Sequence, residues 1–165
     1  MASDELDTQW DGKEEDTLEN RYLTFAVNDQ EYGIEIRYVT EIVGIQKITE
    51  VPNMPKFVKG VINLRGRIIP VIYIRSRFGI DELAFDDRTC VIVTKIDELS
   101  VGLIVDTVNE VMDIAAEYVS PPPSIGMEDV HRYLSGIART GDEVKILLDV
   151  KKLLFDSELN ELANA

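Results

Sequence analysis

The stretch YGIEIRYVTEIVGI, residues Tyr32–Ile45, decides the fold because its pattern occurs twice in the chain. It aligns without a gap with VGLIVDTVNEVMDI, residues Val101–Ile114. The identical pairs are Gly33/Gly102, Val39/Val108, Glu41/Glu110 and Ile45/Ile114, and they share one offset, called the first offset below. Two copies of one pattern in a chain of 165 residues indicate an internal duplication.

The repeat continues toward the C-terminus in a second pair of blocks. The aligned pairs there are Gly60/Gly136, Val61/Ile137, Ile72/Leu148 and Ile74/Val150, and their common spacing is called the second offset. The second offset is larger than the first, so the second copy contains an insertion between its two blocks. The pattern predicts two related halves, at about 21–85 and 86–155.

Alternating apolar residues and β-branched runs predict a mainly β domain over residues 21–165. Strands are predicted for the segments YLTFAV, EYGIEI, VINL, RIIPVIYI, CVIVTKI, SVGLIV, NEVMDI, SGIART and VKILLDV. The polar pairs Asn28–Asp29, Asp97–Glu98 and Gly141–Asp142 are typical of hairpin turns. The chain is therefore expected to contain several short antiparallel pairs.

Helix signals are confined to short segments. Short helices are predicted near Tyr38–Val43 and Pro55–Val58. A C-terminal helix is predicted at about 151–163, where leucines recur at helical spacing.

Each half, with about five short strands, is too small to remain an open flat sheet with long exposed edges. Each is expected to curl into a small barrel, and two barrels side by side enclose a seam. One continuous sandwich, in which the repeat arises by chance, is the alternative.

Charge is distributed unevenly along the chain, whose formal net charge is −14. Residues 1–20 hold eight acids and one lysine and are predicted to form a disordered acidic tail. The thirty residues Val51–Ile80 contain no acid, and their cations are Lys56, Lys59, Arg65, Arg67, Arg75 and Arg77. This window is either a solvated rim that balances acids elsewhere or a docking face for an acidic partner.

Catalytic chemistry is difficult to build from this composition. His131 is the single histidine and Cys90 the single cysteine, and no GxSxG, HExxH or GxGxxG motif occurs. We expect no enzyme activity, no metal and no cofactor. The acidic chain also disfavours a nucleic-acid-binding barrel, which is kept as the weaker alternative. No leader or membrane-spanning stretch is evident, so a cytoplasmic protein is expected.

The run VINLRGRIIPVI places a charged residue on a tight turn. Gly66 is expected to adopt a positive φ, and this would hold Arg65 on a stiff corner. A fixed guanidinium suits a carboxylate or backbone carbonyls at an interface. A local ion pair with Glu41 is the other interpretation, and the two are compatible.

Several of the segments described above resemble those of a known protein family. The run VTEIV…VPNMPKFVKGVINLRGRIIPVI, followed by CVIV, VGLIVDTVNEVMDI, YLSGIART and VKILLDVKKLL, resembles the CheW family of bacterial chemotaxis coupling proteins from about Tyr22 to Phe155. The resemblance implies two five-stranded SH3-like barrels side by side, with short helices and a C-terminal helix. It also implies a non-catalytic adaptor that couples the histidine kinase CheA to methyl-accepting chemotaxis receptors.

The resemblance also assigns site residues. Arg65, with Asn63 and Gly66, matches the family's NLRG motif, and Glu41 matches its acidic partner. Positions implied to contact the kinase or the receptor are Val39, Ile42, Gly60, Val108 and Val111. Gly102 and Gly136 match positions whose alteration disturbs coupling, and they are interpreted equally as fold positions or contact positions. Tyr73 departs from the aspartate that is common in the family.

The implied partners are the regulatory domain of CheA and the cytoplasmic tips of the receptors, so a cytoplasmic protein recruited to membrane receptor arrays is expected. In this hypothesis one apolar barrel surface docks on the kinase, and the seam near Arg65 and residues 39–42 accepts a receptor helix tip. An adaptor of a motility or developmental kinase pathway would share every motif and remains the alternative.

Overall fold

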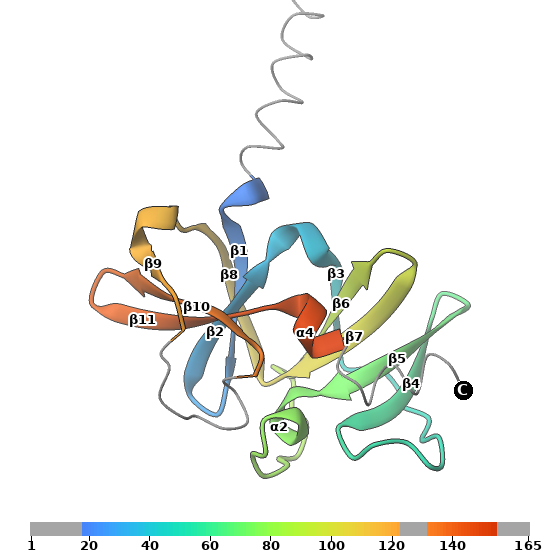
Figure 1. The fold of residues 1–165 in the computed structure, drawn as a ribbon. Helices are drawn as coiled ribbons and strands as arrows, with labels where there is room; N and C mark the ends of the chain where they lie inside the picture. The colour runs from blue at the N-terminus through green and yellow to red at the C-terminus, as the bar shows by residue number, and fades with distance from the viewer. Residues whose placement is uncertain (1–17, 123–131, 155–165) are drawn as a thin grey trace, which may run out of the picture.

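The computed structural model describes residues 18–122 and 132–154 and places their strands in two sheets (Figure 1). The five-stranded sheet has the order β3-β6-β7-β5-β4 and the six-stranded sheet the order β8-β1-β2-β11-β10-β9. The strands of the five-stranded sheet are β3 (Val39–Gly44), β4 (Val58–Leu64), β5 (Arg67–Tyr73), β6 (Cys90–Ile96) and β7 (Leu99–Val105). Those of the six-stranded sheet are β1 (Arg21–Val27), β2 (Gln30–Glu35), β8 (Thr107–Asp113), β9 (Val119–Ser120), β10 (Leu134–Thr140) and β11 (Glu143–Leu148).

The sheets do not follow the predicted halves at 21–85 and 86–155. Strands β1 and β2 of the first half lie between β8 and β11 of the second half. In the same way, β6 and β7 lie between β3 and β5 of the first half. Each barrel therefore takes strands from both halves, because the halves pair with each other as well as within themselves. The expectation of one barrel per half was wrong in this respect.

The registers of the two sheets confirm the repeat. In the five-stranded sheet Gly102 on β7 lies opposite Val71 on β5, and in the six-stranded sheet Gly33 on β2 lies opposite Leu147 on β11. These pairs are equivalent under the two offsets. The register shift at Gly60 in β4 recurs at the equivalent position in β10. Two sheets with the same strand order and register are a structural duplication rather than a chance pattern.

Three apolar clusters stabilise this arrangement. The largest contains side chains of both sheets, among them Phe25, Ile72 and Leu103, and it fills the seam between the barrels. The five-stranded barrel has its own interior cluster, which includes Ile62, Leu64, Ile69, Val71, Tyr73, Val91, Val93 and Ile104. The interior of the six-stranded barrel is smaller and consists of Ile114, Ala138 and Leu147.

The helices are short and differ in part from expectation. They are η1 (Ile36–Tyr38), α2 (Ile74–Arg77), η2 (Ala116–Tyr118) and α4 (Val150–Leu154). Of the helix predicted near Tyr38–Val43, only Tyr38 is helical, as the last residue of η1. The remainder belongs to strand β3, since its β-branched residues suit a sheet. The helix predicted at Pro55–Val58 is a turn followed by β4. The C-terminal helix begins as predicted, but residues 155–163 lie outside the described residues. Residues 1–17 of the tail predicted at 1–20 also lie outside them, whereas Leu18 and Glu19 are helical and Asn20 forms a turn.

The predicted hairpin turns are confirmed. Asn28 and Asp29 have φ values of 53° and 65°, Asp97 has 54° and Gly141 has 66°. Positive φ in a two-residue loop matches the twist of the strands that it joins. In the described part of the chain, no helix is long and apolar enough to cross a membrane.

Candidate functional site

The turn between β4 and β5 holds Arg65 in an unfavourable backbone conformation. Arg65 and Gly66 form a two-residue loop with φ values of 53° and 86°. The side-chain Oδ1 of Asn63 accepts a hydrogen bond of 2.8 Å from the backbone N–H of Gly66. Such loops favour glycine or asparagine at both positions, and a left-handed conformation costs other residues about 1 kcal/mol or more. The positive φ predicted for Gly66 is confirmed, and Arg65 shares it.

Arg65 forms an ion pair with Glu41 that joins the two edges of the five-stranded sheet. Its Nη2 donates to Oε2 of Glu41 on β3, whereas Arg65 follows β4 at the other edge. The pair confirms the predicted contact, although Glu41 lies on a strand and not on a helix. The Arg65 side chain is 68% exposed and that of Glu41 29%. A pair this exposed contributes at most about 1 kcal/mol, so stability alone does not explain an arginine at this strained position.

The position of this ion pair differs from the prediction. The β4–β5 turn lies at the end of the five-stranded sheet that is remote from the six-stranded sheet (Figure 1). The seam between the barrels is filled by the largest apolar cluster. The turn that carries Arg65 therefore projects away from the six-stranded sheet, whereas the sequence placed Arg65 near the seam; the surface that a receptor would contact stays a prediction.

Each barrel end also exposes apolar side chains, and these are related by the repeat. On the five-stranded sheet, Ile42 is 42% exposed and Ile68 is 64% exposed. At the equivalent positions of the six-stranded sheet, Val111 is 47% and Val144 is 54% exposed. Ile42 and Val111 were expected as contact residues. Ile68 and Val144 were missed, although the second offset aligns them and an isoleucine beside Ile69 breaks the alternation of the strand.

The other predicted valines do not form a free surface. Val39 and Val108 are partly buried and pack against the cluster between the sheets. The structure therefore gives these two equivalent residues a role in joining the barrels.

Of the four glycines predicted for the site, all except Gly66 are positions where a side chain does not fit. Gly60 is buried with a φ of 148°, and an added Cβ would lie 2.1 Å from the carbonyl oxygen of Thr49. A Cβ on Gly102 would lie 2.7 Å from Cγ1 of Val91, and one on Gly136 would lie 2.8 Å from Cγ1 of Val119. Close packing accounts for all three glycines, so an effect of substitution there needs no direct partner contact.

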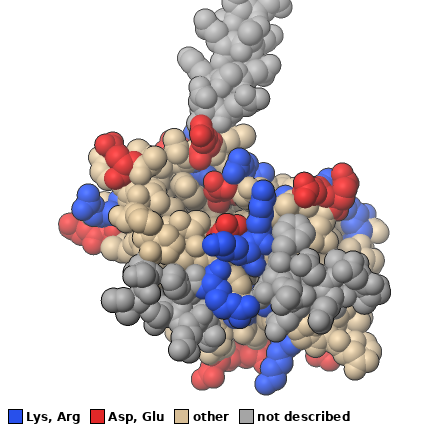
Figure 2. All heavy atoms as spheres, in the orientation of Figure 1, with Lys and Arg blue, Asp and Glu red and all other residues tan. Residues whose placement is uncertain are grey.

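The basic window is largely neutralised within the chain. Lys59 pairs with Glu82 and Arg75 with Asp106, in addition to the ion pair of Arg65. Basic and acidic side chains are interspersed around the rim of the face in Figure 2, with one band of basic side chains near its centre. This arrangement favours the balancing interpretation of the window over an extended face for acidic partners or nucleic acid.

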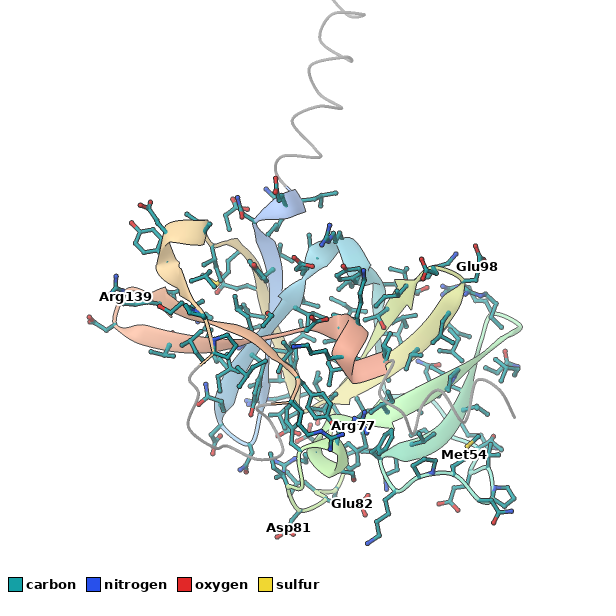
Figure 3. All side chains as sticks on the ribbon, in the orientation of Figure 1. Met54, Arg77, Asp81, Glu82, Glu98 and Arg139 are labelled. Carbon is teal, nitrogen blue, oxygen red and sulfur yellow. The ribbon has the colours of Figure 1, made fainter. Side chains whose placement is uncertain are left out.

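Arg77 also belongs to the basic window but is buried. Its guanidinium lies 3.8 Å from the ring centroid of Phe57 and 4.8 Å from that of Tyr133 (Figure 3). Stacking on aromatic faces suits a guanidinium in a low-dielectric environment. Arg77 is therefore a core residue rather than part of a docking face.

The buried ion pair between Arg75 and Asp106 connects the two halves of the chain. Arg75 of α2 donates to both carboxylate oxygens of Asp106 at 2.9 and 2.7 Å, and its side chain is 8% exposed. Burial alone would raise the pKa of Asp106, but hydrogen bonds from Arg75 and from the backbone N–H of Asn28, with the charge of Arg75, lower it. The hydrogen bonds to Asp106 likewise raise the pKa of Arg75. The pair fixes α2 against the turn after β7.

Tyr73 anchors the segment that follows α2. Its side chain is buried, and its hydroxyl donates to the carbonyl oxygen of Leu83 at 3.0 Å and accepts from the N–H of Leu83 at 3.1 Å. The tyrosine that replaces the family's aspartate therefore has a structural contact. Within the described ranges no group of three His, Cys, Asp or Glu side chains could hold a metal ion.

Known proteins resemble this chain over most of its length. Residues 21–158 match the family model of the CheW-like domain. The chain is 38% identical to the chemotaxis protein CheW of Klebsiella aerogenes over 87% of both chains. It is 32% identical to CheW of Treponema pallidum over 90% of this chain and 96% of that protein. The crystal structure of scaffolding protein TtCheW from Thermoanaerobacter tengcongensis superposes with a TM-score of 0.77 at 35% identity, covering 84% of this chain and 94% of that one.

Proposed function

The chain belongs to the CheW family of chemotaxis proteins, and from this premise we propose that it bridges the regulatory domain of the histidine kinase CheA and the cytoplasmic tips of methyl-accepting receptors. Its role is that of a non-catalytic adaptor in chemotaxis signalling. Recruitment to membrane receptor arrays follows from the same proposal, because the receptors would hold the adaptor at the membrane.

The observation that carries the proposal is the pair of equivalent barrel ends. The β4–β5 hairpin and the β10–β11 hairpin project at opposite ends of the molecule (Figure 1). Each of the two sheets exposes two apolar side chains at equivalent positions, Ile42 with Ile68 and Val111 with Val144. A rigid body with two outward contact surfaces can hold two partners at once without competition between them.

We assign the receptor to the end that contains Arg65. An arginine that is 68% exposed on a stiff turn, and whose partner Glu41 precedes the exposed Ile42 on β3, combines a directional donor with apolar area. Glu41 fixes one edge of the guanidinium and leaves the remaining N–H groups available for carbonyl or carboxylate groups of a helix tip. Apolar burial would supply most of the affinity, and Arg65 would set the register.

We assign the kinase to the end that contains Val111 and Val144. The expected partner surface is a barrel of similar construction. A chain whose two ends are equivalent can pack head to tail against a similar barrel. The apolar side chains at this end lie on β8, at the edge of its sheet, and on β11. Exposed apolar side chains on two strands of one barrel suit such packing.

Binding titrations with purified partners test both assignments. Val111→Asp is expected to weaken binding to the CheA regulatory domain at least tenfold and to leave receptor binding unchanged. Ile42→Asp is expected to have the opposite pattern. Leu83→Asp is the matched control, because Leu83 is 58% exposed but lies at neither end. Wild-type binding of both partners by both variants would contradict the proposal.

A further inference from the structure

The barrel end at β8 and the β10–β11 turn lacks the arginine that its equivalent carries. Glu110 on β8 occupies the position of Glu41, and Gly141 occupies the position of Arg65 under the two offsets. The backbone is alike, since φ is 66° at Gly141 and 53° at Arg65. The carboxylate of the ion pair is therefore present at this end, but its guanidinium is missing.

The interior of this barrel is also open where its equivalent is closed. The core residues Ile62, Leu64 and Ile69 of the five-stranded barrel are replaced by Ala138, Thr140 and Lys145. Of these replacements, Thr140 and Lys145 line a pocket of about 870 Å³, together with residues of β8, of the segment that follows it and of the β10–β11 hairpin.

Two polar groups of the pocket lack an interaction partner among the described residues. The hydroxyl oxygen of Thr140 is buried and has no hydrogen-bond partner among the described residues. Glu110, which lines the pocket, has no ion pair in the part of the chain that the structure describes. A buried hydroxyl without a partner is unfavourable, and a ligand that donates a hydrogen bond would supply the missing partner.

The other acids of the pocket are already neutralised. Asp113 pairs with Arg21 at 3.0 Å, and Glu143 pairs with Lys145 at 3.2 Å. Lys145 is buried and also pairs with Glu31; burial lowers its pKa, but these hydrogen bonds outweigh burial and raise it. Lys145 is therefore held as a cation by its own partners.

The remaining charged residue of the pocket and its apolar wall limit the ligands that it can bind. Arg139 lines the pocket and projects from the β10–β11 hairpin at the edge of the molecule (Figure 3). Met112, Ile114 and Tyr118 form an apolar wall, and Tyr118 is 48% exposed. The pocket thus combines an acceptor pair, Glu110 and Thr140, with an apolar surface for an aliphatic stem.

We propose that this pocket receives an arginine side chain presented by a loop of a partner protein. Its guanidinium would pair with Glu110 and donate to the hydroxyl of Thr140, as Arg65 pairs with Glu41 at the equivalent end. Arginine fits better than lysine because its planar fork presents several donors to two separate acceptors.

The structure disfavours two other occupants. The chain's own residues 1–17 are strongly acidic and would place like charge beside Glu110. The β4–β5 turn of a second copy presents an arginine that its own Glu41 already binds. The proposal goes beyond the assigned kinase and receptor contacts and does not depend on either of them being the partner.

A peptide probe tests the pocket on the full-length chain. The probe is a cyclised peptide with the sequence of residues 62–69, INLRGRII, which presents the arginine turn free of Glu41. NMR titration of the isotope-labelled chain is expected to show saturable shifts at Glu110, Thr140 and Gly141. A peptide with citrulline in place of the turn arginine is expected to bind at least tenfold more weakly, and so is the arginine peptide with the Glu110→Gln chain.

A variant that fills the pocket gives a second arm. A Cβ at Gly141 meets no atom within 4 Å, and the backbone there already has the conformation of Arg65. Gly141→Arg is expected to pair with Glu110, to keep or raise the melting temperature and to abolish peptide binding. Asp97→Arg, which adds a cation at a left-handed turn outside the pocket, is the control that retains binding.

Several results would overturn the proposal. They are the absence of saturable binding by the wild-type chain, or undiminished binding by Glu110→Gln. Movement of the Trp10 indole signal on peptide addition would identify the chain's own tail as the occupant. Glu110-dependent self-association in sedimentation would identify a second copy. Kinase and receptor binding are measured separately, by the titrations of the Val111 and Ile42 variants.

Discussion

Gly102→Ala is expected to destabilise the protein without touching any exposed surface. Gly102 lies on β7 between two neighbouring strands, and an added Cβ would lie 2.7 Å from Cγ1 of Val91 and 2.9 Å from Cγ1 of Val71. Both valines are fully buried and stiff at χ1, so they cannot rotate away freely. Overpacking of this kind costs about 1–3 kcal/mol.

The net effect on the free energy of unfolding is smaller than the overpacking term. Replacing glycine by alanine lowers the conformational entropy of the unfolded chain, and this stabilises the folded protein by about 0.4–1 kcal/mol. We therefore expect Gly102→Ala to lose about 1–2 kcal/mol. The assay is urea unfolding followed by circular dichroism, with linear extrapolation to water.

Gly44→Ala provides the matched control. Gly44 is an exposed residue of strand β3, and an added Cβ there meets no atom within 4 Å. This variant is expected to be as stable as the wild type or slightly more stable. The reasoning would be refuted if Gly102→Ala were as stable as Gly44→Ala, because the close contacts with Val91 and Val71 would then carry no cost.

Three further predictions concern stability. Gly60→Ala is expected to cost more than Gly102→Ala, because its Cβ would meet a backbone oxygen at 2.1 Å at a φ of 148°; urea unfolding of both variants compares them. Arg75→Ala is expected to cost about 3 kcal/mol, since it leaves Asp106 without its buried partner, and an undiminished melting temperature would contradict this. Asp106→Asn is expected to be destabilising at pH 7, and its difference from the wild type should shrink as the pH falls below about 3.8, because the lowered pKa of Asp106 stabilises the fold only while the carboxylate is charged. Unfolding curves at pH 7 and pH 3 measure that change, and a difference that stays constant would exclude the linkage.

Much of the fold could be predicted from the sequence because the repeat fixes which strands are equivalent. The two offsets place Gly33 with Gly102 and Gly60 with Gly136, and the structure has the same registers at these pairs. The exchange of strands between the halves could not be predicted. Alternation shows which side chains face a core, but it does not show which strand lies beside which.

The sequence predicted which residues form the candidate site better than it predicted where they lie. The contact of Arg65 with Glu41 was expected, yet Glu41 lies on a strand, since four β-branched residues favour extended backbone over a short helix. Whether a glycine serves packing or contact depends on neighbours from distant segments, such as Thr49 beside Gly60. The positive φ of Arg65 was also missed, because the turn type follows from the strand pairing.

Receptor control of CheA in a reconstituted mixture of receptor membranes, kinase and adaptor tests the central claim most directly. Arg65→Asn suits the left-handed turn, so it is expected to be at least as stable as the wild type and yet to lose coupling between attractant and kinase phosphorylation. Arg67→Asn, on the same hairpin with a single hydrogen bond to Ser100, is expected to couple normally. Wild-type coupling by a folded Arg65→Asn protein would contradict the account.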